Sequence, residues 1–243
     1  MSWCERPILF NGAMVRAILE GRKTVTRRLV KPAFSDAVTE VFPYSGSPEA
    51  WMASCPGDPQ TPWHEQTREC PFGKPGDRLW VRETWSDVNM CGAPALAYRA
   101  DGDIRDLMAE DLFLDEDGSF NYVDQRWKKL DFCCWYADLH LARWRPSIHM
   151  PRWASRILLE ITAVRVERLQ DISEAQAEAE GVERPENITN VDVWDGAERE
   201  LFNAMNQPRA RFRRLWGDIN GQASWDSNPW VWVVEFKVVE GLA

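Results

Sequence analysis

The segment NGAMVRAILE GRKTVTRRLV, residues 11–30, combines a helix signal, a helix stop and a strand signal. Asn11 is a favourable N-cap, because its side chain can accept a hydrogen bond from the first helical turn. Apolar side chains follow at helical spacing: Met14, Val15, Ile18 and Leu19. Gly21 is typical of a helix C-terminus, and the β-branched run after it predicts a strand over 23–30.

The junction between this helix and this strand, GRKTVTRR at 21–28, packs four cations and two hydroxyls into eight residues. A Lys in a desolvated pocket beside other cations has a lowered pKa and can act as a base. A Thr hydroxyl needs such a base to become a nucleophile. Lys23 and Thr26 would point to opposite faces of a regular strand, so they share a site only if the chain still turns at Lys23. The alternative is a basic edge strand with solvated side chains.

Composition excludes several protein classes. The chain has 243 residues, of which 44 % are apolar and 12 % aromatic, enough for a sizeable core, so we exclude a disordered or fibrous chain. We find no run of about 18 apolar residues, as a membrane helix would need, and expect no membrane partner. The first residues lack the pattern of a secretory leader, which predicts a cytoplasmic location.

Charge is distributed in blocks along a chain whose net charge is −9. Residues 1–32 and 143–168 carry +5 and +4, whereas residues 101–140 and 169–200 carry −7 and −8. The overall acidity argues against indiscriminate binding to long DNA. A local basic site on an acidic body suits a small anionic ligand or a short nucleic-acid segment, although ordinary solvated faces would give the same blocks.

The six cysteines are interpreted as reduced thiols, because a chain of this size and apolar content needs no disulfide framework. Cys55, His64, Cys70 and Cys91 could collect a zinc ion in principle, but their spacings match no finger pattern. We therefore expect no metal.

Beyond the first segment, strands are expected over 78–85, 96–100, 157–166 and 230–239, with helices over 173–181, 195–205 and 208–216. Residues 32–76 hold eight prolines and no sustained period, and they are predicted to be irregular. Residues 101–142 are acidic and aromatic and resemble an insertion. The connections between the expected strands differ from one another, which favours a mixed, mostly antiparallel barrel over a doubly wound sheet.

Two further groups of residues offer chemistry. Glu180 lies in the last turn of a helix that Ser173 and Gln176 open with a capping box, and the helix dipole there disfavours negative charge. This suits a proton-transferring group, although an exposed acid on an acidic helix is the simpler interpretation. The segment PSIHMPRWASR at 146–156 offers stacking and anion-binding groups that suit a base with a phosphate or ribose: His149, Arg152, Trp153 and Arg156. A rigid loop that packs an aromatic side chain against the barrel is an equally good interpretation.

The motif Gly21-Arg22-Lys23 with Thr26 and Arg28 resembles the signature of ASCH domains, members of the PUA-like superfamily. Gly76-Asp77 before a strand, the 157–166 strand, the 172–182 helix and the 230–238 strand follow in the same order as in that family. The whole chain resembles the long, tryptophan-rich ASCH proteins of tailed phages and prophages. The resemblance implies an α+β fold, a PUA-like mixed, mostly antiparallel β-barrel with flanking helices, as one domain over 1–243 with insertions at about 33–75 and 90–150.

Small bacterial members of this family are amidohydrolases that remove the acetyl group from N4-acetylcytidine. Their Lys, their Thr three residues later and their Glu near a helix end correspond to Lys23, Thr26 and Glu180. The resemblance thus implies a hydrolase of N4-acylated cytosine nucleosides or nucleotides in the cytoplasm of a bacterial host, without a cofactor. The residues expected to bind substrate are Arg22, Arg28, His149, Arg152, Trp153 and Arg156. Arg27 departs from the small members, which have an apolar residue there.

Other ASCH proteins are regarded as RNA-binding modules or ribonucleases, so a non-catalytic RNA or nucleotide binder is the main alternative. An accessory role in phage assembly is a weaker one. Three structural predictions follow. The first is that one sheet contains the segments 21–28, 76–85, 156–166 and 230–238. The second is that one cavity is lined by Lys23, Thr26 and Glu180. The third is that the 149–156 segment covers the mouth of this cavity.

Overall fold

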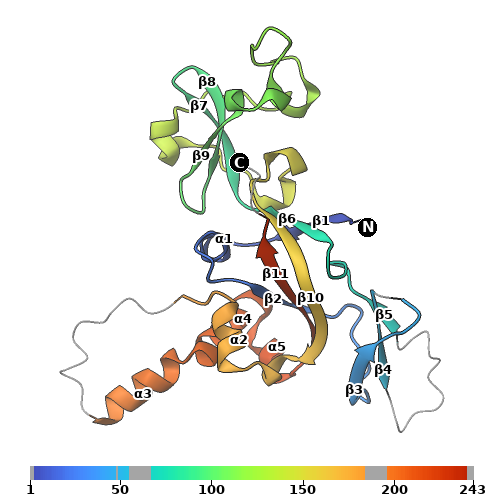
Figure 1. The fold of residues 1–243 in the computed structure, drawn as a ribbon. Coiled ribbons are helices and arrows are strands. Elements are labelled where there is room, and N and C mark those ends of the chain that lie inside the picture. The colour runs from blue at the N-terminus through green and yellow to red at the C-terminus, as the bar shows by residue number, and fades with distance from the viewer. Residues whose placement is uncertain (1–2, 48, 55–66, 184–195, 240–243) are drawn as a thin grey trace. The chain divides into compact units, whose positions relative to one another are not determined.

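The computed structural model describes residues 3–47, 49–54, 67–183 and 196–239, and Figure 1 shows its elements. Two compact units divide the chain. The first contains the described residues among 1–6, 17–79 and 158–242, and the second contains residues 7–16 and 80–157. The predicted insertion at 33–75 falls in the first unit, and the one at 90–150 falls in the second.

The largest sheet has five strands in the order β1-β6-β10-β11-β2. Their bounds are β1 Glu5–Leu9, β6 Arg78–Arg82, β10 Leu158–Arg168, β11 Trp230–Val238 and β2 Val25–Leu29. The sheet therefore contains a strand from each of the four predicted segments, which confirms that they share one sheet. β11 pairs antiparallel with β10 on one side and with β2 on the other. Both faces of β11 are buried from Val231 to Val234, which explains its long apolar run.

Helices cover one face of this sheet in the first unit (Figure 1). Phe212 and Trp216 of α4 (Pro208–Asn220) and Trp225 of α5 (Gln222–Asp226) pack in one cluster with Val231 and Val233 of β11. Ala177 of α2 (Glu174–Ala179) completes the same cluster. The predicted helix over 195–205 corresponds to α3 (Gly196–Asn206). α1 spans Gly12–Leu19 and precedes the turn at Gly21, as predicted.

Residues 32–76 are not wholly irregular, and this corrects the sequence prediction. They contain a three-stranded antiparallel sheet of β3 (Glu40–Pro43), β4 (Ala50–Ser54) and β5 (Thr67–Glu69). These strands are too short and too interrupted by proline to show a period. Their stability comes from pairing and from contacts such as the edge-to-face packing of Trp51 on Trp232, with ring centroids 6.4 Å apart.

The second unit is built on an antiparallel sheet of β7 (Trp85–Met90), β8 (Ala93–Tyr98) and β9 (Ile104–Asp106). The expected strand over 78–85 is instead two strands, because β6 ends at Arg82 and β7 begins at Trp85. Short 3₁₀ helices follow at Leu107–Ala109, Asp111–Phe113, Gln125–Trp127, Tyr136–Leu141, Ser147–His149 and Arg152–Ala154. A further one, Leu169–Asp171, lies in the first unit. An aromatic cluster that includes Phe113, Phe120 and Trp127 forms the core of the second unit.

The protein is thus a mixed α+β structure with mostly antiparallel sheets, as expected. The strand pairings of the described residues form open sheets, so the closed PUA-like barrel stays a prediction. Within the same residues, no helix has the length and apolar character that crossing a membrane requires.

Candidate active site

Lys23 is positioned by the abrupt end of α1. Its backbone N–H donates to the carbonyl of Ala17 at 2.9 Å, and Gly21 takes the left-handed φ of +71° that this turn requires. Lys23 then forms an isolated antiparallel bridge with Glu180 before β2 begins. Lys23 therefore lies outside the regular strand that carries Thr26.

Glu180 is positioned by the end of α2. Ser173 and Gln176 form the predicted capping box at the start of this helix. At its other end, the Glu180 N–H donates to the Gln176 carbonyl at 3.1 Å, and Gly181 turns the chain with φ of +74°. A Cβ at Gly181 would lie 2.7 Å from the Cβ of Lys23, so only glycine lets these two segments approach this closely.

The two side chains meet in a buried ion pair. Lys23 Nζ donates to Glu180 Oε2 at 2.8 Å and also to the backbone carbonyls of Glu180 and Val25, at 2.9 and 2.8 Å. These contacts use all three donors of an ammonium group. Lys23 is 1 % exposed and Glu180 is 3 % exposed. Burial lowers the pKa of Lys23, and the charges of Arg28 and Arg27 act in the same direction, while Glu180 opposes them.

Arg27 is a member of this site to which the sequence reasoning assigned no role. Its Nη1 donates to Glu180 Oε1 at 3.2 Å, and its Nη2 donates to Glu167 Oε2 at 3.2 Å and to Gln176 Oε1 at 3.1 Å. The available signal was strand alternation, which places Arg27 with Val25 and Leu29 on the face that the helices cover. A cation on that apolar face requires a buried acid.

Thr26 and Arg28 alternate with Arg27 along β2, where their register partners on β11 are Val234 and Trp232. Thr26 is 2 % exposed. Desolvation lowers the pKa of Arg28, with the charge of Glu180 opposing it. Lys23 thus contacts Glu180 directly. That Thr26 shares a cavity with these two residues and acts as the nucleophile stays a prediction.

A pocket of about 300 Å³ opens beside the ion pair. Its lining comes from the two chain segments that hold the pair: Gly21, Arg22, Thr24, Ala175, Glu178, Ala179 and Val182. Arg22, one of the expected substrate-binding residues, donates from Nη1 to the Gly181 carbonyl at 3.3 Å and pairs with Glu20 at 2.5 Å. The pocket is therefore lined by one cationic residue, Arg22, one acidic residue, Glu178, and one hydroxyl residue, Thr24, next to a site whose charged groups are buried.

The remaining predicted binding residues lie in the second unit. Trp153 packs edge-on against Trp85, Phe113 and Trp127, with ring centroids 5.9, 6.1 and 5.9 Å apart. His149 and Arg152 lie in the 3₁₀ helices Ser147–His149 and Arg152–Ala154. The covering role over the Lys23 site stays a prediction.

Arg156 is held by three carboxylates of the same unit. Its guanidinium forms a bidentate pair with Glu83, at 2.9 and 3.0 Å. It also pairs with Asp101 and Asp103 at 2.9 Å and lies 4.1 Å from the ring centroid of Tyr98. These contacts are those of a residue that fixes local structure.

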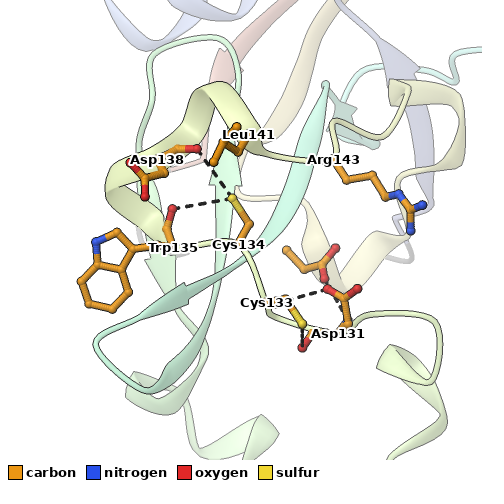
Figure 2. Close-up of a pocket in the computed structure, with 8 residues that line it drawn as sticks. Asp131, Cys133, Cys134, Trp135, Asp138, Leu141 and Arg143 are labelled. Carbon is orange, nitrogen blue, oxygen red and sulfur yellow. Dashed lines mark hydrogen bonds between the residues drawn. The ribbon is translucent and has the colours of Figure 1, made fainter.

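A larger pocket, of about 550 Å³, lies in the second unit, and Figure 2 shows the residues that line it. Its two adjacent thiols donate to different backbone carbonyls: Cys133 to Asp131, and Cys134 to Trp135 and Asp138. The negative charge of Asp131 raises the pKa of Cys133. This pocket thus holds protonated thiols, which are poor nucleophiles and poor metal ligands.

No cluster of three or more potential metal-ligating side chains occurs in the described part of the chain. Of the residues weighed for zinc, Cys55 and His64 lie outside the described residues, Cys70 is buried and Cys91 is exposed. Comparisons with protein-family models, curated proteins and solved structures find no match to this chain.

Proposed function

We propose that the protein is an amidohydrolase with a PUA-like, ASCH-type fold, which removes the acyl group from N4-acylated cytosine nucleosides or nucleotides. The observation that carries this proposal is the buried contact of 2.8 Å between Lys23 Nζ and Glu180 Oε2. The resemblance to ASCH amidohydrolases selects these two residues, which lie 157 positions apart, and a desolvated Lys beside a carboxylate is a suitable proton-transfer pair.

The proposed reaction has two stages. Thr26 Oγ attacks the acyl carbon while its proton passes to Lys23, and the bond between that carbon and N4 then breaks. The departing amine takes a proton that Glu180 relays from Lys23. Water then hydrolyses the acyl ester on Thr26, which releases the carboxylic acid and restores the hydroxyl. Arg28 stabilises the oxyanion that forms at each addition step.

Lys23 must release its proton before it can accept the one from Thr26. Two physical features support this. Burial lowers the pKa of Lys23, and the neighbouring guanidinium groups oppose a further positive charge.

The test is incubation of the purified protein with N4-acetylcytidine and its 5′-monophosphate, with the deacetylated product measured by chromatography. The wild type and the exposed control T39A are expected to release product, and T26A and K23M are expected to lose at least about a hundredfold in kcat. Binding of either compound without turnover by the wild type would favour the RNA- or nucleotide-binding alternative. Absence of both binding and turnover would refute the proposal.

A further inference from the structure

Arg27 is a buried guanidinium between apolar neighbours on β2. It is 4 % exposed, and its strand neighbours on that face, Val25 and Leu29, pack into the cluster beneath the helices. A buried cation is costly unless hydrogen bonds and opposite charge compensate it. Arg27 achieves this by contacting two carboxylates, those of Glu180 and Glu167.

These contacts belong to a row of alternating charges that crosses β2, β10 and β11. From the surface inward, Glu235 pairs with Arg165, and Arg165 pairs with Glu167. Glu167 then pairs with Arg27 at 3.2 Å, Arg27 pairs with Glu180 at 3.2 Å, and Glu180 pairs with Lys23 at 2.8 Å. Exposure falls along the row, from 43 % for the Glu235 side chain to none for Lys23. Arg27 is therefore the link between a partly solvated network and the buried pair.

We propose that Arg27 is a positioning residue whose fixed charge holds the Glu180 carboxylate, so that Lys23 can give up its proton and accept the one from Thr26. This inference rests on the proposed function for its role in turnover. The effect of Arg27 on the protonation of Lys23 beside Glu180 does not depend on that function and can be tested without substrate.

The argument depends on what happens when Lys23 becomes neutral. A Glu180 carboxylate with Lys23 as its sole partner would then be a buried, unpaired charge, and its cost would keep the proton on Lys23. A guanidinium group is not deprotonated in proteins, so Arg27 continues to compensate Glu180. In the reaction, the O–H bond of Thr26 breaks, an N–H bond forms on Lys23, and the charge on Arg27 does not change.

The charged groups that act on Lys23 are Glu180, Arg27 and Arg28. Arg27 Nη1 donates directly to Glu180 Oε1 at 3.2 Å. Removal of Arg27 should therefore have two effects with the same sign. It removes a repulsive charge, and it leaves Glu180 more dependent on Lys23, so Lys23 should hold its proton to a higher pH.

The experiment is an NMR titration of the side-chain ε carbons in protein labelled with ¹³C-lysine. The chain has six lysines, and the Lys23 signal is assigned by its loss in K23M. The titration midpoint of Lys23 is expected to rise in R27M. The matched control is R165M, which removes a cation of the same row that touches neither Glu180 nor Lys23, and its shift should be smaller. An R27M midpoint that stays unchanged, falls, or rises no more than that of R165M overturns the proposal.

A second variant keeps the proposal testable if R27M fails to fold. E167Q leaves Arg27 in place and removes its other carboxylate, so the Lys23 midpoint should fall. A midpoint that stays or rises in folded E167Q overturns the proposal.

Turnover gives a separate measurement. R27M should lose about tenfold or more in kcat near neutral pH and recover part of it as the pH rises, whereas R27K should retain more activity. A loss in R27M that is equal at every pH would contradict the role of Arg27 in turnover. If the wild type shows no deacylation, the proposed function fails, and the titration still decides whether Arg27 controls the proton on Lys23.

Discussion

Lys23 and Glu180 form a buried ion pair, so their contributions to the stability of the fold should be coupled. Removal of one partner of a buried ion pair leaves an uncompensated charge, whereas replacement of both by apolar groups is often neutral. We expect E180L, which removes the carboxylate that Lys23 and Arg27 share, to cost about 3–5 kcal/mol in the free energy of unfolding, measured by urea denaturation. K23M should cost less, because Arg27 still compensates Glu180. The double variant should cost less than E180L alone, because it leaves no buried ammonium without its carboxylate. A double variant whose cost equals the sum of the two would show that the pair is not coupled.

Cys70 provides a prediction on pH. Burial raises the pKa of its thiol to about 11, whereas an unfolded Cys titrates near 8.5. The folded state therefore holds this proton more tightly, and the contribution to stability is lost as the pH rises from about 8.5 through 11. Thiolate is the reactive form, so iodoacetamide at pH 8 should label the exposed Cys4 and Cys91 well before Cys70. Mass spectrometry of the native protein measures this order. Labelling of Cys70 at the same rate as Cys91 would contradict it.

At the scale of single residues, the sequence indicated which residues form the site better than it indicated how their side chains are arranged. The cations and hydroxyls of 21–28 and the last turn of a capped helix made Lys23 and Glu180 candidates, and the resemblance to ASCH domains selected them over the alternative of solvated faces. Arg27 was missed because its role depends on Glu167, which lies 140 positions away, and on a helix that covers this face of β2. Neither feature has a signal in the local sequence.

Among the elements, the ends of α1 and α2 bring the site together, and Gly181 is the position where they are closest. An alanine there would take a strained φ of +74° and would bring its Cβ within 2.7 Å of the Cβ atoms of Lys23 and Ala17. Gly21 is a matched control, because its φ is +71° but a Cβ there would meet nothing within 4 Å. G21A should cost about 1–2 kcal/mol for backbone strain alone. G181A should cost at least about 1 kcal/mol more because of crowding. Equal losses in thermal or urea unfolding would show that the two segments can separate without cost.

Helices and long strands were predictable because each carries its own signal, a capping box for α2 and an apolar run for β10 and β11. The sheet of β3, β4 and β5 was not, since its strands are three to five residues long. A strand of that length shows at most two repeats of alternation, and its pairing partner is set by tertiary contacts. The split between β6 and β7 was also missed, because the sequence RLWVRETW at 78–85 contains no Gly, Pro, Asn or Asp to signal a turn between them.

At the scale of the whole molecule, each unit has a separate hydrophobic cluster. The second cluster is predominantly aromatic, and Trp153 contributes to it through three edge-to-face contacts. The segment at 146–156 was selected from sequence as a binding element. Its stiff, aromatic character serves packing equally well, and sequence alone does not separate the two roles.

The variant W153A separates them. Trp153 is partly buried against the cluster, so its truncation should cost about 2–3 kcal/mol and lower the melting temperature of the protein. Trp135 is the control in the same unit, because it is 43 % exposed, and W135A should change the melting temperature little. The affinity for N4-acetylcytidine is measured for each variant per folded molecule. A stability loss with unchanged affinity assigns Trp153 to the core and removes it from the substrate site. Weaker binding by a factor of about ten, with a melting temperature close to that of the wild type, would instead place its indole on the bound base, since stacking contributes about 1–3 kcal/mol.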